Sequence, residues 1–208
     1  LDGEEIRDAA LLASGLMVNQ LGGKSVYPYQ PVGLWMELNN RPGYSKEYPQ
    51  GSGDDLYRRS IYTFWKRTVP SPMLKILDAP EREFCTIRRS RTNTPSQALV
   101  LLNSVQFVEA ARHLGERMMK YDALRLEDKL TFGFRLVTAR KPTEIEMKAF
   151  MEAFESERRK MAASPQTALK ILQVGESEFD STLDQSQLAA FATIARLYLN
   201  LDEAITKE

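Results

Sequence analysis

Helix start signals, spread over the whole chain, are the feature that most constrains its fold. In each signal, an N-cap residue with a side-chain oxygen is followed three positions later by Glu or Gln, and each side chain can accept a hydrogen bond from the other residue's backbone amide. Four such pairs are Asp2 with Glu5, Thr94 with Gln97, Thr143 with Glu146, and Asp184 with Gln187. Helices are therefore expected to begin at four widely separated points.

Apolar residues recur at helical spacing behind these signals. One such stripe is Val105, Val108, Ala111, Leu114 and Met118. A stripe of this width is what a helix needs to pack on a core, and no segment alternates for long enough to predict a strand. We therefore predict an all-α fold, an irregular bundle of about eight helices. Residues 54–68 and 126–138 are expected to form two of them.

Length and composition predict one helical domain over residues 1–208. The chain has 208 residues, of which 43% are hydrophobic and 27% charged, and this is enough to bury a substantial core. Because the chain begins at Leu1 rather than Met, we expect a fragment of a larger multidomain protein. No apolar run approaches the roughly 20 residues that span a bilayer, so no membrane span is expected.

A long polar loop is expected near residues 39–53. Its sequence, NNRPGYSKEYPQGSG, contains no aliphatic residue and five Gly or Pro, so it has little to contribute to a core. Loops of this length in compact domains are either mobile or functional. Tyr44 and Tyr48 give this one aromatic side chains, and both interpretations stay open.

Residues 54–104 combine positive charge, aromatic bulk and helix punctuation. Nine of these residues are Lys or Arg. A surface that only has to be soluble does not need this mixture, so the segment predicts either a buried polar network or a binding face. The candidate anion, ligand or docking residues are Arg58, Arg59, Trp65, Lys66, Arg67, Asp78, Arg82, Arg88, Arg89, Thr92, Asn93 and Thr94.

An anion site is one hypothesis for this segment. Arg88 and Arg89 lie shortly before the helix start at Thr94, where free backbone amides and the helix dipole favour a negative charge. Guanidinium groups also bind phosphate, sulfate and carboxylate well. The alternative is that Thr94 is a plain cap and that the arginines are paired within the fold.

Two further functions are weighed against a binding module. Asp78 or Glu83 could act as acid or base in an enzyme for acidic or sulfated polysaccharide, although salt bridges to the neighbouring arginines explain these carboxylates more simply. A module for single-stranded nucleic acid ranks third, because 28 basic and 28 acidic residues cancel over the chain and leave no overall attraction for a polyanion.

The chain has one histidine and one cysteine, the two residue types that most often carry nucleophilic or metal chemistry. His113 is the only histidine and Cys85 the only cysteine, so a histidine triad, an internal disulfide and a multi-thiolate metal site lack their partners. We expect a structural or surface role for His113, and we expect Cys85 to be a small buried hydrophobe.

Three stretches carry a family resemblance: YPYQPVGLW, the closing AxxARLYLNLDEAITKE, and LYRRSIYTFWKRTVPSPMLKILDAPEREFCTIRRSRTNTPSQALVLLNS. They resemble a planctomycete-type domain of unknown function that follows cytochrome c domains in large, mostly secreted proteins. The likeness covers nearly the whole chain and is densest from Leu56 to Val108. That family often has Phe where this chain has Leu77.

The resemblance implies a context rather than a reaction. It implies an extracytoplasmic protein, periplasmic or secreted, with haem in an upstream cytochrome c-type domain of the same polypeptide. This chain has no CxxCH motif, so no cofactor is expected in it. The leading hypothesis is an accessory helical module of unknown activity, whose Arg- and aromatic-rich segment serves docking or anion binding. Its partner would be the cytochrome domain, with an acidic glycan as a second candidate.

Overall fold

Helices make up the regular structure of this chain, which confirms the predicted all-α class. The computed structural model describes residues 1–38 and 46–206, and no strand occurs among them. The predicted loop at 39–53 lies partly outside the described residues, and 46–52 contain no helix. The α-helices are α1 (Gly3–Ser14), α2 (Leu34–Leu38), α3 (Pro72–Ile76), α4 (Pro95–Asn103), α5 (Val105–Lys120), α6 (Leu126–Thr138), α7 (Glu144–Ala163), α8 (Pro165–Leu172), α9 (Gln185–Leu199) and α10 (Asp202–Ile205).

The four start signals all open helices. Thr94 and Thr143 make the full capping box with Gln97 and Glu146, and Asp184 accepts a bond from the Gln187 amide. In α1, the Asp2 amide donates to Glu5 Oε2 at 2.8 Å. These signals place the helix starts because each one satisfies backbone amides that have no partner inside the helix.

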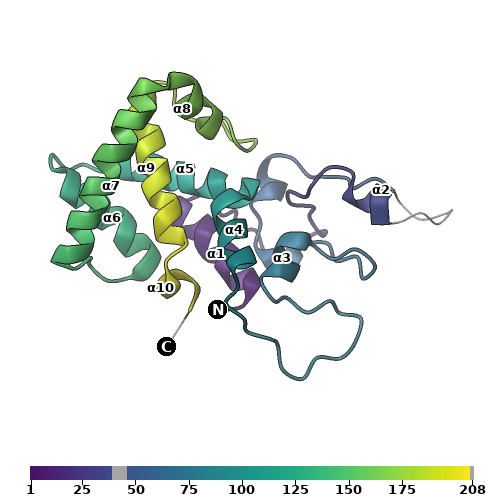
Figure 1. Cartoon of the computed structure of the whole chain (residues 1–208). Helices are drawn as coiled ribbons and strands as arrows, with labels where there is room; N and C mark the ends of the chain where they lie inside the picture. The colour runs from purple at the N-terminus through teal and green to yellow at the C-terminus, as the bar shows by residue number, and fades with distance from the viewer. Residues whose placement is uncertain (39–45, 207–208) are drawn as a thin grey trace.

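The centre of the molecule is the contact between α5 and α9, around which α1, α6, α7 and α10 are arranged (Figure 1). Leu114 of α5 and Ile194 and Tyr198 of α9 are completely buried in the main core. The two helices approach closely at Gly115, where an added methyl carbon would lie 2.7 Å from the Ala192 amide nitrogen. A smaller apolar cluster joins α7, α8 and α9.

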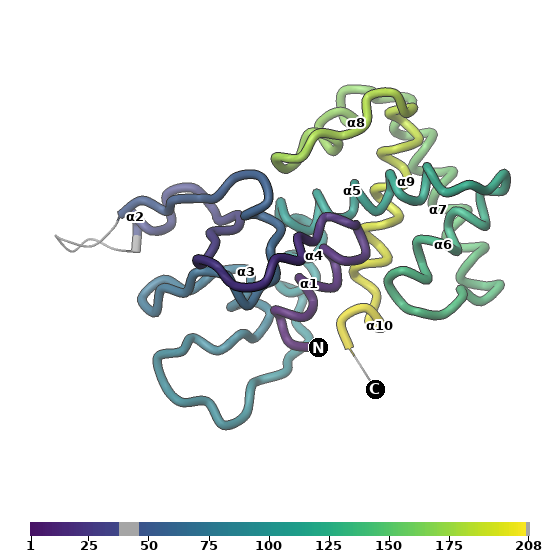
Figure 2. Tube along the Cα trace, turned by 180° about the vertical axis from the view of Figure 1, so that it is seen from behind, coloured from purple at the N-terminus to yellow at the C-terminus, as the bar shows by residue number. Residues whose placement is uncertain are grey.

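The part of the chain between α1 and α3 has little regular structure and lies on the opposite side of α1 from α6 and α7 (Figures 1 and 2). Backbone bonds between distant stretches hold it together. Val18 N donates to Tyr57 O at 3.0 Å, Val26 N donates to Tyr62 O at 2.8 Å, and Phe64 N donates to Val26 O at 2.8 Å.

The predicted helix over residues 54–68 is wrong. Only two short 3-10 helices form there, Gly53–Leu56 and Ser60–Tyr62. On the predicted helix, Arg58 would lie on the charged face and Ile61 on the packing face, but Arg58 is 4% exposed and Ile61 is 72% exposed. Between and after these short helices, backbone groups of the stretch bond to residues 18–26, and its β-branched and aromatic residues are weak helix formers that do not oppose this pairing.

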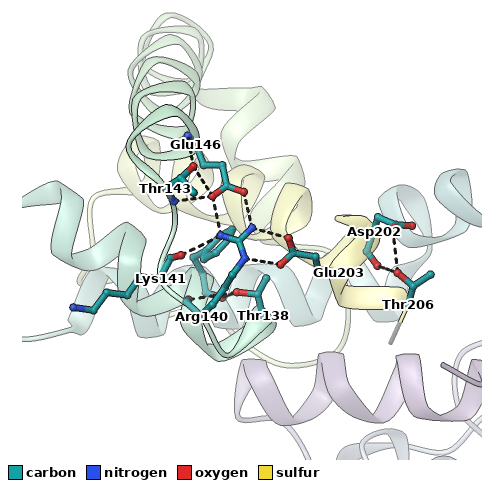
Figure 3. Close-up of polar contacts among 9 residues, drawn as sticks. Thr138, Arg140, Lys141, Thr143, Glu146, Asp202, Glu203 and Thr206 are labelled. Atoms are coloured by element: carbon teal, nitrogen blue, oxygen red, sulfur yellow. Dashed lines mark hydrogen bonds and ion pairs between the residues drawn. The ribbon is translucent and has the colours of Figure 1, made fainter. Parts of the chain in front are cut away.

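Helix α10 is fastened to the turn between α6 and α7 by one arginine (Figure 3). Arg140 donates to both carboxylate oxygens of Glu146, at 2.6 and 2.8 Å, and to both oxygens of Glu203, at 2.6 and 2.8 Å. Hydrogen bonding to Arg140, helped by the Thr143 amide, lowers the pKa of Glu146 to about 2. The amino terminus also donates to Ile205 O at 2.9 Å, so residue 1 is held against α10.

Candidate functional site

The twelve candidate residues of the Arg- and aromatic-rich segment do not converge on one cavity. They divide into a buried group, an aromatic group, a group before α4 and an exposed group, and Arg59 lies apart from all four. The α3–α4 loop, residues 77–94, carries part of these groups. Both views show this loop standing out from the helical body (Figures 1 and 2).

Arg58 belongs to the buried group and holds irregular backbone in place. Its guanidinium donates to the carbonyls of Gln20 and Lys24 at 3.1 Å, and also to that of Gly22. The same group lies 4.0 Å from the centre of the Tyr62 ring. Every one of these contacts is internal, so Arg58 serves the fold, as a buried cation with several carbonyl acceptors commonly does.

Three more candidates, Trp65, Lys66 and Arg82, make contacts that involve tryptophan rings. Lys66 lies over the Trp35 ring, with Nζ 3.9 Å from its centre. Trp65 donates from Nε1 to the Glu81 carbonyl at 3.0 Å, and the Arg82 guanidinium lies 4.7 Å from the Trp65 ring centre. The contacts of Trp65 with Glu81 and Arg82 attach the start of the α3–α4 loop to the irregular part of the chain. Arg59 lies elsewhere, 3.5 Å from Asp8 of α1.

Before α4, an internal carboxylate occupies the donors that an external anion would use. Asp78 Oδ2 accepts bonds from the Thr92 amide at 2.6 Å, the Thr92 hydroxyl at 2.8 Å and Gln97 Nε2 at 3.1 Å. Thr94 caps the helix as expected. Arg89 forms ion pairs with Glu4 at 2.8 Å and Asp2 at 3.2 Å, and the bond to Glu4 raises the pKa of Arg89.

The remaining candidates, Arg67, Arg88 and Asn93, are exposed. Two large apolar residues of the α3–α4 loop accompany them at the surface, since Phe84 is 81% exposed and Ile87 is fully exposed. Cys85 is exposed as well, so the prediction that it is a buried hydrophobe is wrong.

Two buried polar networks were not anticipated from the sequence, and the first surrounds Arg7 of α1. This side chain is completely buried. It donates to the carbonyls of Leu56 at 2.7 Å and Arg58 at 2.9 Å, and to Ser60 Oγ and Gln106 Oε1 at 3.1 Å. Burial lowers the pKa of Arg7 to about 10. One guanidinium therefore joins α1, α5 and the irregular part of the chain.

The second network is built on Glu109 of α5, whose side chain is also completely buried. Glu109 Oε1 accepts bonds from the Tyr57 hydroxyl at 2.8 Å and from the amide and hydroxyl of Ser177, at 2.9 and 2.6 Å. Arg112 donates to the Ser177 carbonyl at 2.6 Å and forms an ion pair with Glu116 at 3.2 Å. Gly175 fits over this carboxylate, because a methyl group there would lie 2.3 Å from the Glu109 carboxyl carbon.

His113 joins the second network and is half-buried, with Nε2 2.8 Å from Ser177 Oγ. The Ser177 hydroxyl donates its hydrogen bond to Glu109. His113 must therefore be the donor, from Nε2, in its own bond with Ser177 Oγ, and it cannot act as the base for this serine. Burial, reinforced by the charges of Arg112 and Lys120, lowers the pKa of His113 to about 4. The group is neutral at pH 7 and has a structural role.

Helix periodicity contains a signal for both networks. Arg7 lies on the same face of α1 as Ala10 and Ser14, and Glu109, Arg112 and Glu116 follow each other at intervals of three and four on one face of α5. Charges at i, i+3 and i+7 inside an otherwise apolar stripe indicate a buried ion network.

Groups of acidic, histidine and cysteine side chains able to hold a metal ion do not occur among residues 1–38 and 46–206. In the same residues no helix combines the length and apolar character needed to cross a membrane.

Comparison with known proteins assigns a family. No curated protein and no solved structure matches the chain significantly. The family model PSD1, described as a protein of unknown function (DUF1553), matches residues 1–154. This match takes in the irregular part, the α3–α4 loop, α5 and most of α7. The chain therefore belongs to the PSD1 family of proteins of unknown function.

Proposed function

We propose that this chain is an accessory helical module of an extracytoplasmic multidomain protein, and that its α3–α4 loop docks on a cytochrome c-type domain of the same polypeptide. The observation that carries the docking role is the exposure of Phe84 and Ile87 beside Arg88. Aromatic and arginine side chains are enriched in protein interfaces. The cytochrome partner and the location rest on the sequence resemblance.

Docking is favoured over capture of a small anion by the contacts of the same loop. The donors before α4 are bonded to Asp78, and Arg89 is paired with Glu4 and Asp2. Arg88 and Arg91, in contrast, form no ion pair with any residue of the described ranges. A partner of this loop therefore needs an acidic surface with an apolar centre.

The test is a binding titration between this chain and the cytochrome c-type domain of the full-length protein. We expect the double substitution Ile87→Ser with Arg88→Ser to weaken binding about tenfold, since residues central to an interface commonly contribute this much. The matched control, Ile145→Ser with Lys148→Ser, changes an exposed apolar and a basic residue on α7 and should bind like the wild type.

Titrations at different ionic strength, and with heparin in place of the cytochrome domain, distinguish a protein partner from an acidic glycan. If the arginines meet acidic groups, affinity should fall as ionic strength rises. Absence of binding by the wild type, or equal weakening by the control, contradicts docking through this loop. Binding of heparin by the wild type without binding of the cytochrome domain would favour the acidic glycan as the partner.

A further inference from the structure

Helix α6 packs on the core with one face and leaves its other face open as the floor of a groove. The residues of α6 that line this groove are Asp128, Thr131, Phe132, Arg135 and Leu136. Their spacing of three and one places them on one side of the helix. The opposite side carries Leu130 and Phe134, which are completely buried. The turns before and after α6 form the walls of the groove.

Two aromatic rings lie in the middle of this open face. Phe132 of α6 stacks on Tyr121 of the preceding turn, with ring centres 4.3 Å apart and an angle of 7° between the ring planes. Tyr121 is nevertheless 42% exposed, and Leu124 of the same turn is fully exposed. Aromatic and large apolar side chains left together at a surface are typical of protein interfaces.

The charged residues that line the groove are Asp122, Asp128, Arg135 and Lys141. None of these four forms an ion pair with any residue of 1–38 or 46–206. Charges next to them in sequence are paired. Glu127 pairs with Arg125, and Arg140 pairs with both Glu146 and Glu203. The groove therefore collects the charges of this region that have no internal partner.

The length of α6 explains why Asp128 and Arg135 do not meet each other. They are seven residues apart, which is roughly 10 Å along a helix at 1.5 Å per residue. In α7, by contrast, Glu155 pairs with Arg158, which is three residues away. The helix dipole favours an acid in the first turn and a base in the last. This order is stable in one molecule and leaves both side chains available to a second.

The four charges are arranged symmetrically along the chain. Asp128 and Arg135 are equally far from the midpoint between residues 131 and 132. Asp122 and Lys141 share the same midpoint. If two copies of α6 lie antiparallel about a two-fold axis at this midpoint, each acid of one copy comes to a base of the other. The Phe132 rings of the two copies then meet at the centre.

We propose that this chain forms a two-fold symmetric homodimer through the open face of α6. Asp128 of each copy pairs with Arg135 of the other, and Asp122 pairs with Lys141, around the aromatic centre. Charge favours a second copy as the partner, because a surface of one sign would meet two like charges in the groove. The α3–α4 loop lies apart from α6 in both views (Figures 1 and 2). The dimer therefore goes beyond the proposed docking role and leaves that loop free.

The test is sedimentation equilibrium of the chain over a range of concentrations, and we expect a reversible monomer–dimer equilibrium for the wild type. Asp128→Arg and Arg135→Asp should each weaken dimerisation at least about tenfold, because each places like charges opposite one another at two symmetric points. An equimolar mixture of the two variants should dimerise again, within about threefold of the wild type, because both contacts of the mixed pair join an acid to a base.

Charge reversals elsewhere are the controls. Glu178→Arg and Arg159→Asp change exposed residues outside the groove and should dimerise like the wild type. Recovery in the mixture also distinguishes a lost contact from misfolding of a variant, since mixing cannot repair a misfolded chain. The proposal is overturned if the wild type stays monomeric at about 1 mM, if neither reversal at α6 weakens the dimer, or if the mixture is as weak as its components.

Discussion

Arg7 is a cation whose partners are almost all neutral. Apart from Asp8 at 3.8 Å, it bonds to two carbonyls, a hydroxyl and an amide oxygen. Such a group is costly to bury, and it is retained because its planar fork satisfies acceptors of two separate segments at once, residues 56–60 and α5. Arg7 stabilises the fold because, without it, these buried acceptors would have no hydrogen-bond donor.

Replacement of Arg7 by Leu should lower the free energy of unfolding by about 3–5 kcal/mol, because several buried acceptors lose their donor together. The measurement is urea denaturation followed by circular dichroism. Arg159→Leu, at an exposed position of α7, is the control and should change stability by less than about 0.5 kcal/mol. A similar small effect for both variants would show that water replaces the guanidinium without loss.

His113 should make stability depend on pH. In the unfolded chain the imidazole takes up a proton near its ordinary pKa of 6.5, whereas in the folded protein its pKa is about 4. The unfolded state therefore binds more protons between these values, and the stabilisation is complete above pH 6.5 and is lost as the pH falls towards 4.

His113→Gln, which keeps an N–H donor for Ser177, removes this titration. Relative to the variant, the wild type should lose about 1–2 kcal/mol of stability between pH 6.5 and 4, a value reduced from the full shift because His113 is only partly buried. Urea denaturation at several pH values measures the difference. Parallel curves for the two proteins would contradict the low pKa.

At this scale the sequence predicted part of the candidate site. It predicted that the arginines of residues 54–104 form either a polar network or a binding face, and Arg58 and Arg89 are in internal contacts. It did not predict Arg7 or Glu109, because the partners are distant in sequence: Arg7 bonds to the Leu56 carbonyl, and Glu109 bonds to Tyr57 and Ser177. Which charge meets which acceptor depends on chain crossings that no local pattern encodes.

Helices α5 and α9 show how one missing methyl group sets a packing distance. Gly115→Ala would place a carbon 2.7 Å from backbone of α9, so the helices must separate. We expect a loss of about 1–3 kcal/mol, the usual cost of overpacking, measured by thermal unfolding. In Gly133→Ala the added carbon meets the flexible side chain of Met118, which can move, so the loss should be smaller. The reverse ranking would contradict the close approach.

The contacts of Arg140 should stabilise α10 locally and contribute little to the stability of the whole fold. Glu203→Gln weakens the contact that holds α10 (Figure 3), and since the pair is exposed the melting temperature should hardly change. Hydrogen exchange of the α10 amides should become faster, because local opening is no longer opposed. Glu155→Gln, which breaks an exposed pair within α7, should leave exchange in α10 unchanged. Slow exchange in both variants would show that Ile205 and the amino terminus suffice.

Elements with strong local signals were predicted well, and those determined by tertiary contacts were not. Helix α6 covers the predicted residues 126–138, since its apolar stripe and its packing agree. The stretch 54–68 has helical periodicity too, but its backbone is bonded to residues 18–26. In such a stretch long-range pairing overrides weak helix propensity.

The whole molecule consists of an irregular N-terminal part and a helical C-terminal part joined by buried polar contacts. Both tryptophans, Trp35 and Trp65, are in the irregular part, whereas most helix is in α5–α9. If residues 1–208 are one domain, tryptophan fluorescence and far-ultraviolet circular dichroism should report the same melting midpoint. Midpoints that differ by more than about 5 °C would indicate two folding units.

The bond between Tyr57 and Glu109 joins residues that are 52 positions apart, and this has a consequence for biosynthesis. A ribosome adds about 5–20 residues per second, so Tyr57 leaves it roughly 3–10 s before its acceptor does. Throughout that interval the first hundred residues lack α5, on which their carbonyls and aromatic rings depend. The newly synthesised irregular part is consequently open to chaperones and proteases during that interval.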